Sequence, residues 1–225
     1  MKAGTLYNST NLNAPLSSFR EALLKGLAPD GGLYMPVNLP VFRQDELGKF
    51  SALSYPELAS HIVGSITGDE IGIEELREIC NSVYTFGIPL EHVDARQYIM
   101  RLDQGPTASF KDFAALLMGR LMQYFLGKEK RKITILTATS GDTGSAVANA
   151  FRGLENINVV ILYPANEVTG LQRKQMTTLG GNIRVIEIDG KFDDCQRLVK
   201  TAFMDQSLAE FNLSSANSIN IGRLI

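Results

Sequence analysis

The sequence contains few of the residues that build metal sites and disulfide frameworks. Its 225 residues include no tryptophan, two cysteines and two histidines. Cys80 and Cys195 lie in separate helical patterns without CxxC spacing, so we expect two reduced, packed thiols. His61 lies in an amphipathic helical pattern, where a packing role is the ordinary one. His61 and His92 are the two histidines, which are too few for a His-rich metal site. A Ser-His-Asp triad would have to use one of these two residues. We expect no bound metal.

Long apolar runs and an excess of one charge are also missing. The apolar runs, such as residues 159–163, are far too short to cross a bilayer, and the N-terminal residues lack the apolar core of a signal peptide. The 22 basic and 24 acidic residues leave no global field to attract nucleic acid or an anionic membrane. We therefore expect a cytoplasmic protein with neither partner, and any anionic ligand must be bound by local geometry.

The spacing of apolar residues changes near residue 95 and divides the chain into two parts. Up to residue 95 the apolar residues follow helical spacing, and from residue 96 short apolar runs alternate with helical patterns. This predicts a mostly helical N-terminal domain over 1–95 and an α/β region over 96–225, with a parallel sheet and flanking helices. The expected helices cover 19–27, 55–66, 73–84, 113–126, 143–152, 170–179 and 192–204, and the expected strands cover 97–102, 133–138, 159–163 and 183–188.

In parallel sheets, ligands bind beyond the carboxyl ends of the strands, so the loops there are candidate sites. Lys111 follows the expected strand 97–102 and falls in the first turn of the next helix, which Ser109 and Asp112 would open as a capping box. The positive end of a helix disfavours a second positive charge, and a neutral amine is what Schiff-base chemistry requires. Most lysines at helix starts are solvated surface residues, so the position alone leaves both roles open.

The loop after strand 133–138 reads TSGDTGS over residues 139–145. Two glycines allow close backbone approach, and the following helix offers free N–H groups, so the loop can bind a carboxylate or a phosphate. It contains neither a dinucleotide G-x-G-x-x-G nor a P-loop Gly-Lys-Ser/Thr. The alternative is a glycine-containing loop in which Asp142 or Thr143 caps the helix.

Four blocks make the sequence recognisable. They read GPTASFKDF over 105–113, TATSGDTG over 137–144, LGGN over 179–182 and SANSIN over 215–220. In this order they closely resemble the threonine synthases of the bacterial and yeast type, and LAPDGGLY over 27–34 resembles that family's N-terminal domain. The resemblance covers the whole chain. It implies the tryptophan-synthase-like fold of type II pyridoxal 5′-phosphate enzymes.

The resemblance also assigns roles to individual residues. It makes Lys111 the catalytic lysine that binds the cofactor covalently, with Ser140 and Asp142 also beside the cofactor. The contact of Asp142 stays open, because many relatives have an asparagine there. The substrate-binding residues that it implies are Ser140, Gly141, Asp142, Thr143 and Gly144 for the carboxylate, and Asn217, Ser218 and Arg223 for the phosphate.

An arginine fork beside amide and hydroxyl donors suits a dianion. From the residues alone, Asn217 and Ser218 could equally form a helix N-cap, and Arg223 could be a surface charge.

The implied reaction converts O-phospho-L-homoserine and water to L-threonine and phosphate, the last step of threonine biosynthesis. Family members are longer, so we expect this chain to be an N-terminal portion, inactive alone, that lacks the loop for the cofactor phosphate. The sequence does not fix the oligomeric state, and a monomeric full-length enzyme is compatible with it. Two alternatives remain: another type II amino-acid dehydratase or cysteine-synthase-like lyase, and a non-catalytic phosphate-binding fragment.

Overall fold

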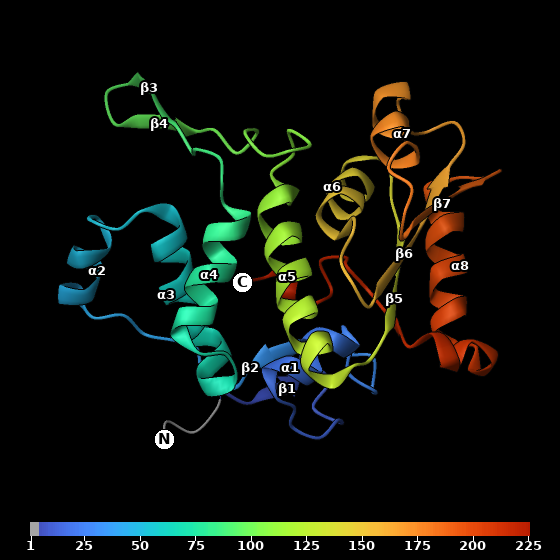
Figure 1. Ribbon diagram of the computed structural model, residues 1–225, viewed down its shortest axis with the longest axis horizontal. Coiled ribbons are helices and arrows are strands. Elements are labelled where there is room, and N and C mark those ends of the chain that lie inside the picture. The colour runs from blue at the N-terminus through green and yellow to red at the C-terminus, as the bar shows by residue number, and fades with distance from the viewer. Residues whose placement is uncertain (1–4) are drawn as a thin grey trace.

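The computed structural model describes residues 5–225 and shows a helical N-terminal region beside a layered α/β region (Figure 1). Four parallel strands form the central sheet, in the order β7-β6-β5-β8. Their bounds are β5 (Ile133–Ala138), β6 (Ile157–Pro164), β7 (Ile183–Ile188) and β8 (Leu213–Ser214). The expected parallel sheet is confirmed, with β8 as an additional short strand that pairs with Thr134 and Ile135 of β5.

Helices cover both faces of this sheet (Figure 1). Every residue of β5 is buried, as a continuous apolar run predicts for a strand covered on two sides. On one face lie α5 (Lys111–Glu129) and α6 (Asp142–Phe151), with α7 (Gly170–Thr177) beyond them. On the other face, α8 (Phe192–Met204) buries Cys195 and Val199 against Leu136 and Leu162. The short turn η2 (Gln206–Phe211) leads from α8 to β8.

The N-terminal region contains the three expected helices, the additional elements α2 (Gln44–Phe50) and η1 (Gly68–Glu70), and an unexpected ribbon. The expected helices are α1 (Phe19–Lys25), α3 (Tyr55–Thr67) and α4 (Ile73–Val83). The predicted capping boxes form, because Glu21 and Glu57 accept hydrogen bonds from the backbone N–H groups of Ser18 and Ser54. A small antiparallel ribbon of β1 (Tyr7–Ser9) and β2 (Tyr34–Pro36) brackets α1, and three-residue strands are too short for periodicity to reveal.

Strand 97–102 was wrongly placed in the central sheet. The structure has β4 (Gln97–Met100) paired antiparallel with β3 (Leu90–Asp94), in a separate two-stranded hairpin. Every residue of both strands is exposed, and the hairpin projects from the rest of the molecule (Figure 1). The residues of a short strand favour an extended backbone but do not determine which strand it pairs with. The sequence pattern could therefore identify this strand but not the sheet to which it belongs.

An aromatic cluster joins the N-terminal helices to α5. Tyr55, Tyr84 and Phe86 surround Phe113, with ring centroids 5.1–6.1 Å from its own. The Tyr84 hydroxyl also donates to the carbonyl oxygen of Phe113 at 3.3 Å, and burial raises the pKa of Tyr84. Because Phe113 lies two positions after Lys111, this cluster fixes the start of α5.

A second connection ties the C-terminal residues to α1. The buried Asn220 amide donates to the carbonyl oxygens of Leu23 and Ser215 at 2.8 and 2.9 Å. Its side-chain oxygen accepts from the N–H of Gly222 and so caps the turn η3 (Ile221–Arg223). This turn packs closely on α1 and α5, since a side chain at Gly222 would overlap Leu23 and Met118.

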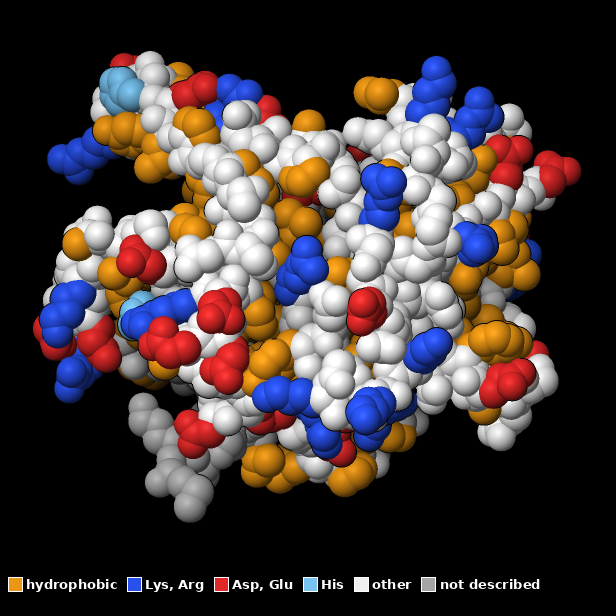
Figure 2. All heavy atoms as spheres, viewed as in Figure 1, with side chains coloured by type: hydrophobic (Ala, Val, Ile, Leu, Met, Phe, Trp, Pro, Cys, Tyr) orange, Lys and Arg blue, Asp and Glu red, His pale blue; other side chains and the backbone are white. Residues whose placement is uncertain are grey.

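The state of the two cysteines and the mixed charges on the surface agree with what the composition predicts. Both cysteines are buried and unpaired, and burial raises the pKa of Cys80 to about 11. Basic and acidic side chains are interspersed over the face shown in Figure 2. None of the helices within residues 5–225 has the length and hydropathy needed to cross a bilayer.

Candidate functional site

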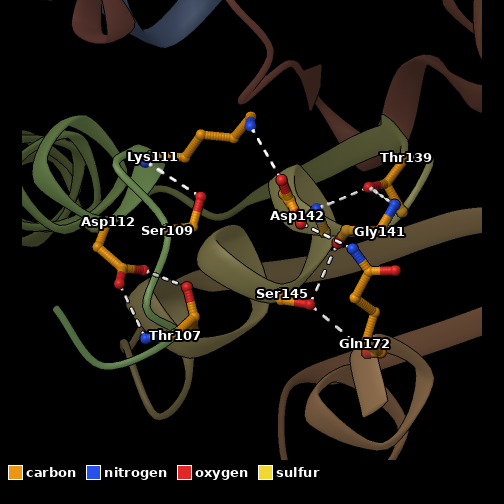
Figure 3. Close-up of polar contacts among 10 residues, drawn as sticks. Thr107, Ser109, Lys111, Asp112, Thr139, Gly141, Asp142, Ser145 and Gln172 are labelled. Atoms are coloured by element: carbon orange, nitrogen blue, oxygen red, sulfur yellow. Dashed lines mark hydrogen bonds and ion pairs between the residues drawn. The ribbon is translucent and has the colours of Figure 1, made fainter. Parts of the chain in front are cut away.

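Lys111 is the first residue of α5, and its side chain extends toward the start of α6 (Figure 3). Its Nζ lies 3.5 Å from Oδ2 of Asp142 and 4.4 Å from the centroid of the Phe110 ring. The Lys111 side chain is 21% exposed and that of Asp142 is 56% exposed, so the pair lies near the surface rather than in the core. The structure thus brings together the two loops that the sequence singled out.

The loop that delivers Lys111 is held by Asp112, which is 1% exposed. The backbone N–H and the hydroxyl of Thr107 donate to the two Asp112 carboxylate oxygens at 2.8 and 2.6 Å. Gly105 packs against the same carboxylate, where a side chain would overlap it. The predicted capping box of Ser109 and Asp112 is therefore wrong, because Asp112 turns back to the loop rather than to the backbone of Ser109.

The loop before α6 is organised by Thr139, which is also buried. Its hydroxyl oxygen accepts hydrogen bonds from the N–H groups of Gly141 and Gly144 at 2.9 and 2.8 Å. Gly141 has φ of 133° and precedes α6 as its N-cap position. The alternative in which Asp142 or Thr143 caps this helix is thus wrong, since Thr139 supplies the oxygen. Asp142 and Thr143 keep first-turn N–H groups, for which helix geometry provides no partner.

Asp142 has a second partner that the sequence did not reveal. The Gln172 side-chain amide donates to Oδ1 of Asp142 at 2.7 Å, whereas Lys111 approaches Oδ2 (Figure 3). Gln172 lies in the first turn of α7, where it forms a capping box with Thr169. The T-x-x-Q pattern after β6 could have indicated that capping box, but not the contact with Asp142.

A hollow of about 420 Å³ opens beside this constellation. It is bounded by residues 99–103 at the end of the hairpin, by the loop 107–110 and by Asp142. Beside it, the Lys111 amine faces the Asp142 carboxylate, which lines the hollow, next to the start of α6 with its first-turn N–H groups. Such a set suits a ligand that carries a carbonyl group and an anionic group.

The predicted phosphate residues lie on the C-terminal segment. The hydroxyl of Thr137, near the end of β5, donates to the side-chain oxygen of Asn217. Ser218 is exposed. Arg223 donates to the carbonyl oxygen of Ala216 at 2.8 Å, its buried Nε has no hydrogen-bond partner among residues 5–225, and burial lowers its pKa.

Two alternatives for this segment are contradicted. Asn220, rather than Asn217 or Ser218, caps the adjacent turn η3. Arg223 is partly buried, which contradicts the alternative that it is a solvent-exposed surface charge. Within the described residues, no hydrogen bond or ion pair joins Ser218 or Arg223 to Lys111 or to the 140–144 loop.

Two family descriptions match the sequence. Residues 6–84 match "Threonine synthase N terminus", and residues 86–221 match "Pyridoxal-phosphate dependent enzyme". Among curated proteins, the chain is 43% identical to threonine synthase of Escherichia coli K12 over 98% of this chain and 51% of that protein. It is 41% identical to threonine synthase of Pseudomonas aeruginosa over 97% of this chain and 48% of that protein.

Solved structures give the same result. The chain matches the pyridoxal-phosphate-bound threonine synthase of Brucella melitensis with a TM-score of 0.91 and 40% identity, over 98% of this chain and 49% of that one. It matches yeast threonine synthase with a TM-score of 0.87 and 35% identity, over 98% and 47%. The chain therefore spans about half the length of the relatives it matches.

Proposed function

The chain belongs to the pyridoxal-phosphate-dependent enzyme family, and from this membership we propose that it forms the N-terminal half of a threonine synthase. The observation that carries the proposal is the pairing of Lys111 with Asp142 at the mouth of the 139–144 loop. The similarity to threonine synthases along nearly the whole chain supports it. A cytoplasmic location, a monomeric full-length enzyme and domains over 1–95 and 96–225 belong to the same proposal.

The residues present fit pyridoxal 5′-phosphate. A primary amine with its charge balanced by a carboxylate stands beside an open hollow. We assign Lys111 as the covalent anchor, and Ser140 and Asp142 as its neighbours at the cofactor. When bound, the cofactor supplies an aldehyde for the amine and a ring that withdraws electrons from the substrate carbons.

Lys111 has a second task in this scheme. Its free amine would take a proton from a substrate carbon and later return one. Asp142 lies within reach of Nζ and holds the amine in place during both transfers. The first turn of α5 is held in place by the hydrogen bonds between Thr107 and Asp112 and by the aromatic cluster. These contacts limit the motion of the Lys111 backbone.

The 140–144 loop is assigned to the substrate carboxylate. The N–H groups of Asp142 and Thr143 point out of the first turn of α6, while Thr139 occupies those of Gly141 and Gly144. The hydroxyl groups of Ser140 and Thr143 add further donors. The loop thus offers a preformed anion site whose backbone needs no rearrangement.

Asn217, Ser218 and Arg223 are assigned to the substrate phosphate. An unpartnered guanidinium Nε that is buried favours an anionic acceptor, because burying a donor without a partner is costly. Charged donors around a leaving phosphate stabilise the negative charge that develops on it. With O-phospho-L-homoserine and water as substrates, the products are L-threonine and phosphate.

Borohydride reduction tests the anchor directly. The chain is incubated with pyridoxal 5′-phosphate, reduced and digested, and the modified peptide is identified by mass spectrometry. We expect the modification at Lys111, its loss in Lys111→Ala and its retention in Lys128→Ala, which changes an exposed lysine on the same helix. Cofactor attached mainly to another lysine would contradict the assignment.

The reaction is tested on the full-length enzyme by measuring phosphate release from O-phospho-L-homoserine. Arg223→Ala should raise KM for this substrate much more than it lowers kcat. Turnover of serine or threonine in place of O-phospho-L-homoserine would favour the dehydratase alternative. Phosphate binding without turnover would favour a non-catalytic module.

A further inference from the structure

We infer that Gln172 is a positioning residue for Lys111 and acts through Asp142. The inference rests on the proposed function, since it concerns the lysine assigned to the cofactor. It adds a residue from a third segment of the chain, the start of α7, to a site built from the starts of α5 and α6.

The first argument is the division of the Asp142 carboxylate. Gln172 Nε2 donates to Oδ1 at 2.7 Å, and Lys111 Nζ lies 3.5 Å from Oδ2. The Asp142 side chain is more than half exposed, so the ion pair alone would leave it free to rotate into solvent. A short hydrogen bond to the opposite oxygen removes that freedom and keeps Oδ2 directed at the amine.

The second argument is that the orientation of the Gln172 amide is itself fixed. Its Oε1 accepts from the N–H and the hydroxyl of Thr169 at 3.1 and 2.9 Å. Because the backbone N–H of Thr169 can only donate, it requires the amide oxygen, and the NH₂ group points the other way, toward Asp142 (Figure 3). The capping box of α7 thus determines which end of the amide the carboxylate meets.

The third argument is the space left for this side chain. A Cβ at Gly141 would overlap the Gln172 carboxamide, so the glycine lets the amide pass across the loop. The Ser145 hydroxyl lies 3.1 Å from the carbonyl oxygen of Gly141 and 3.5 Å from that of Gln172, which links the same two segments through their backbones. Gln172 is therefore fitted to the 139–144 loop.

A capping role alone would also retain a glutamine here, and two substitutions separate the roles. Gln172→Glu keeps an acceptor for Thr169, as in an ordinary capping box, but replaces the donor facing Asp142 with a carboxylate. Gln172→Ala removes both functions. Gln123→Ala serves as the matched control, because Gln123 lies on α5 and contacts Arg120 at 3.1 Å.

The test measures how fast Lys111 reacts, without cofactor or substrate. The 225-residue chain is treated briefly with acetic anhydride at neutral pH, and acetylation of Lys111 is quantified by mass spectrometry relative to the exposed Lys200. In Gln172→Ala, Asp142 no longer holds the amine, so the relative rate should rise by about two- to fivefold, the range for losing a partly exposed ion pair. In Gln172→Glu a second carboxylate stands beside Asp142 and adds negative charge near the amine, so the rate should fall below that of the wild type.

A double-mutant cycle completes the test. In an Asp142→Asn background, Gln172→Ala should leave Lys111 labelling unchanged, because no carboxylate remains to be positioned. Equal labelling in wild type, Gln172→Ala and Gln172→Glu would overturn the inference, as would a full effect of Gln172→Ala in the Asp142→Asn background. Since no cofactor is present, this failure is distinct from a failure of borohydride reduction to mark Lys111.

Discussion

Thr107 and Asp112 close the loop that leads into α5 by two hydrogen bonds to one buried carboxylate. The backbone N–H of Thr107 lies 2.8 Å from one oxygen and its hydroxyl lies 2.6 Å from the other. Asp112 directly follows Lys111, so this contact sets where the first turn of α5 begins. Ala108, inside the closed loop, has φ of 55°, which shows how tightly the backbone turns there.

Replacing Asp112 by alanine should therefore destabilise the protein as well as the site. It leaves two donors of Thr107 without their acceptor, and we expect a loss of about 2 kcal/mol in the free energy of unfolding. Urea denaturation followed by circular dichroism measures this loss. Thr107→Ser, which keeps both donors, is the conservative control and should change stability much less. Equal stability of Asp112→Ala and wild type would show that the loop does not depend on this contact.

The aromatic cluster predicts a coupling between the N-terminal helices and α5. Phe113→Ala removes the ring that Tyr55, Tyr84 and Phe86 contact, and we expect it to cost about 3 kcal/mol of unfolding free energy. Phe211→Ala is the matched control, because Phe211 is 49% exposed. Similar losses in the two variants, measured by thermal unfolding, would contradict a special role for the cluster.

Asp30 predicts a change of stability in acid. Its carboxylate accepts from the Ser9 hydroxyl at 2.6 Å and from the N–H groups of Gly32 and Asn13, and these bonds hold its pKa below the ordinary 3.8. Because the folded-state pKa is lowered, the stabilisation is complete above the unfolded-state pKa and disappears as pH falls through the folded-state pKa.

Unfolding of wild type and Asp30→Asn between pH 2 and 6 checks this prediction. The variant should be the less stable protein near pH 6, and the difference should shrink as the pH falls below about 4, the unfolded-state range for aspartate. Comparing the two proteins at each pH cancels the contribution of other carboxylates. A difference that stays constant over this range would mean that the Asp30 charge does not contribute.

The sequence predicted the longer strands of the central sheet and the helices that connect them. Strands β5, β6 and β7 and the helices between them follow from apolar runs and helical spacing, and alternation alone implies the parallel order. The ribbon of β1 and β2 escaped notice because its pairing joins residues on either side of α1. The hairpin partner of β4 was missed for a related reason, since exposed strands lack the apolar pattern that reveals a strand.

At the site, the sequence predicted which loops matter but not how they are held. Lys111 and Asp142 were singled out separately, one by its position at a helix start and the other by its glycine-containing loop. Their contact joins residues 31 positions apart, and that of Gln172 with Asp142 joins residues 30 positions apart. Such pairings depend on how the helices pack, which single-sequence periodicity does not encode. Thr139 and Thr107 were missed because a threonine that binds backbone N–H groups has no distinctive sequence signature.

The hydrogen bond between Asn220 and Leu23 determines how late in translation the contacts of α1 can be completed. The carbonyl oxygen of Leu23, near the end of α1, receives the Asn220 amide from 197 residues further along the chain. A ribosome adds those residues in roughly 10 to 40 s at ordinary elongation rates. One of the first helices to be translated thus acquires this bond only after the strands β5, β6, β7 and β8 have been made.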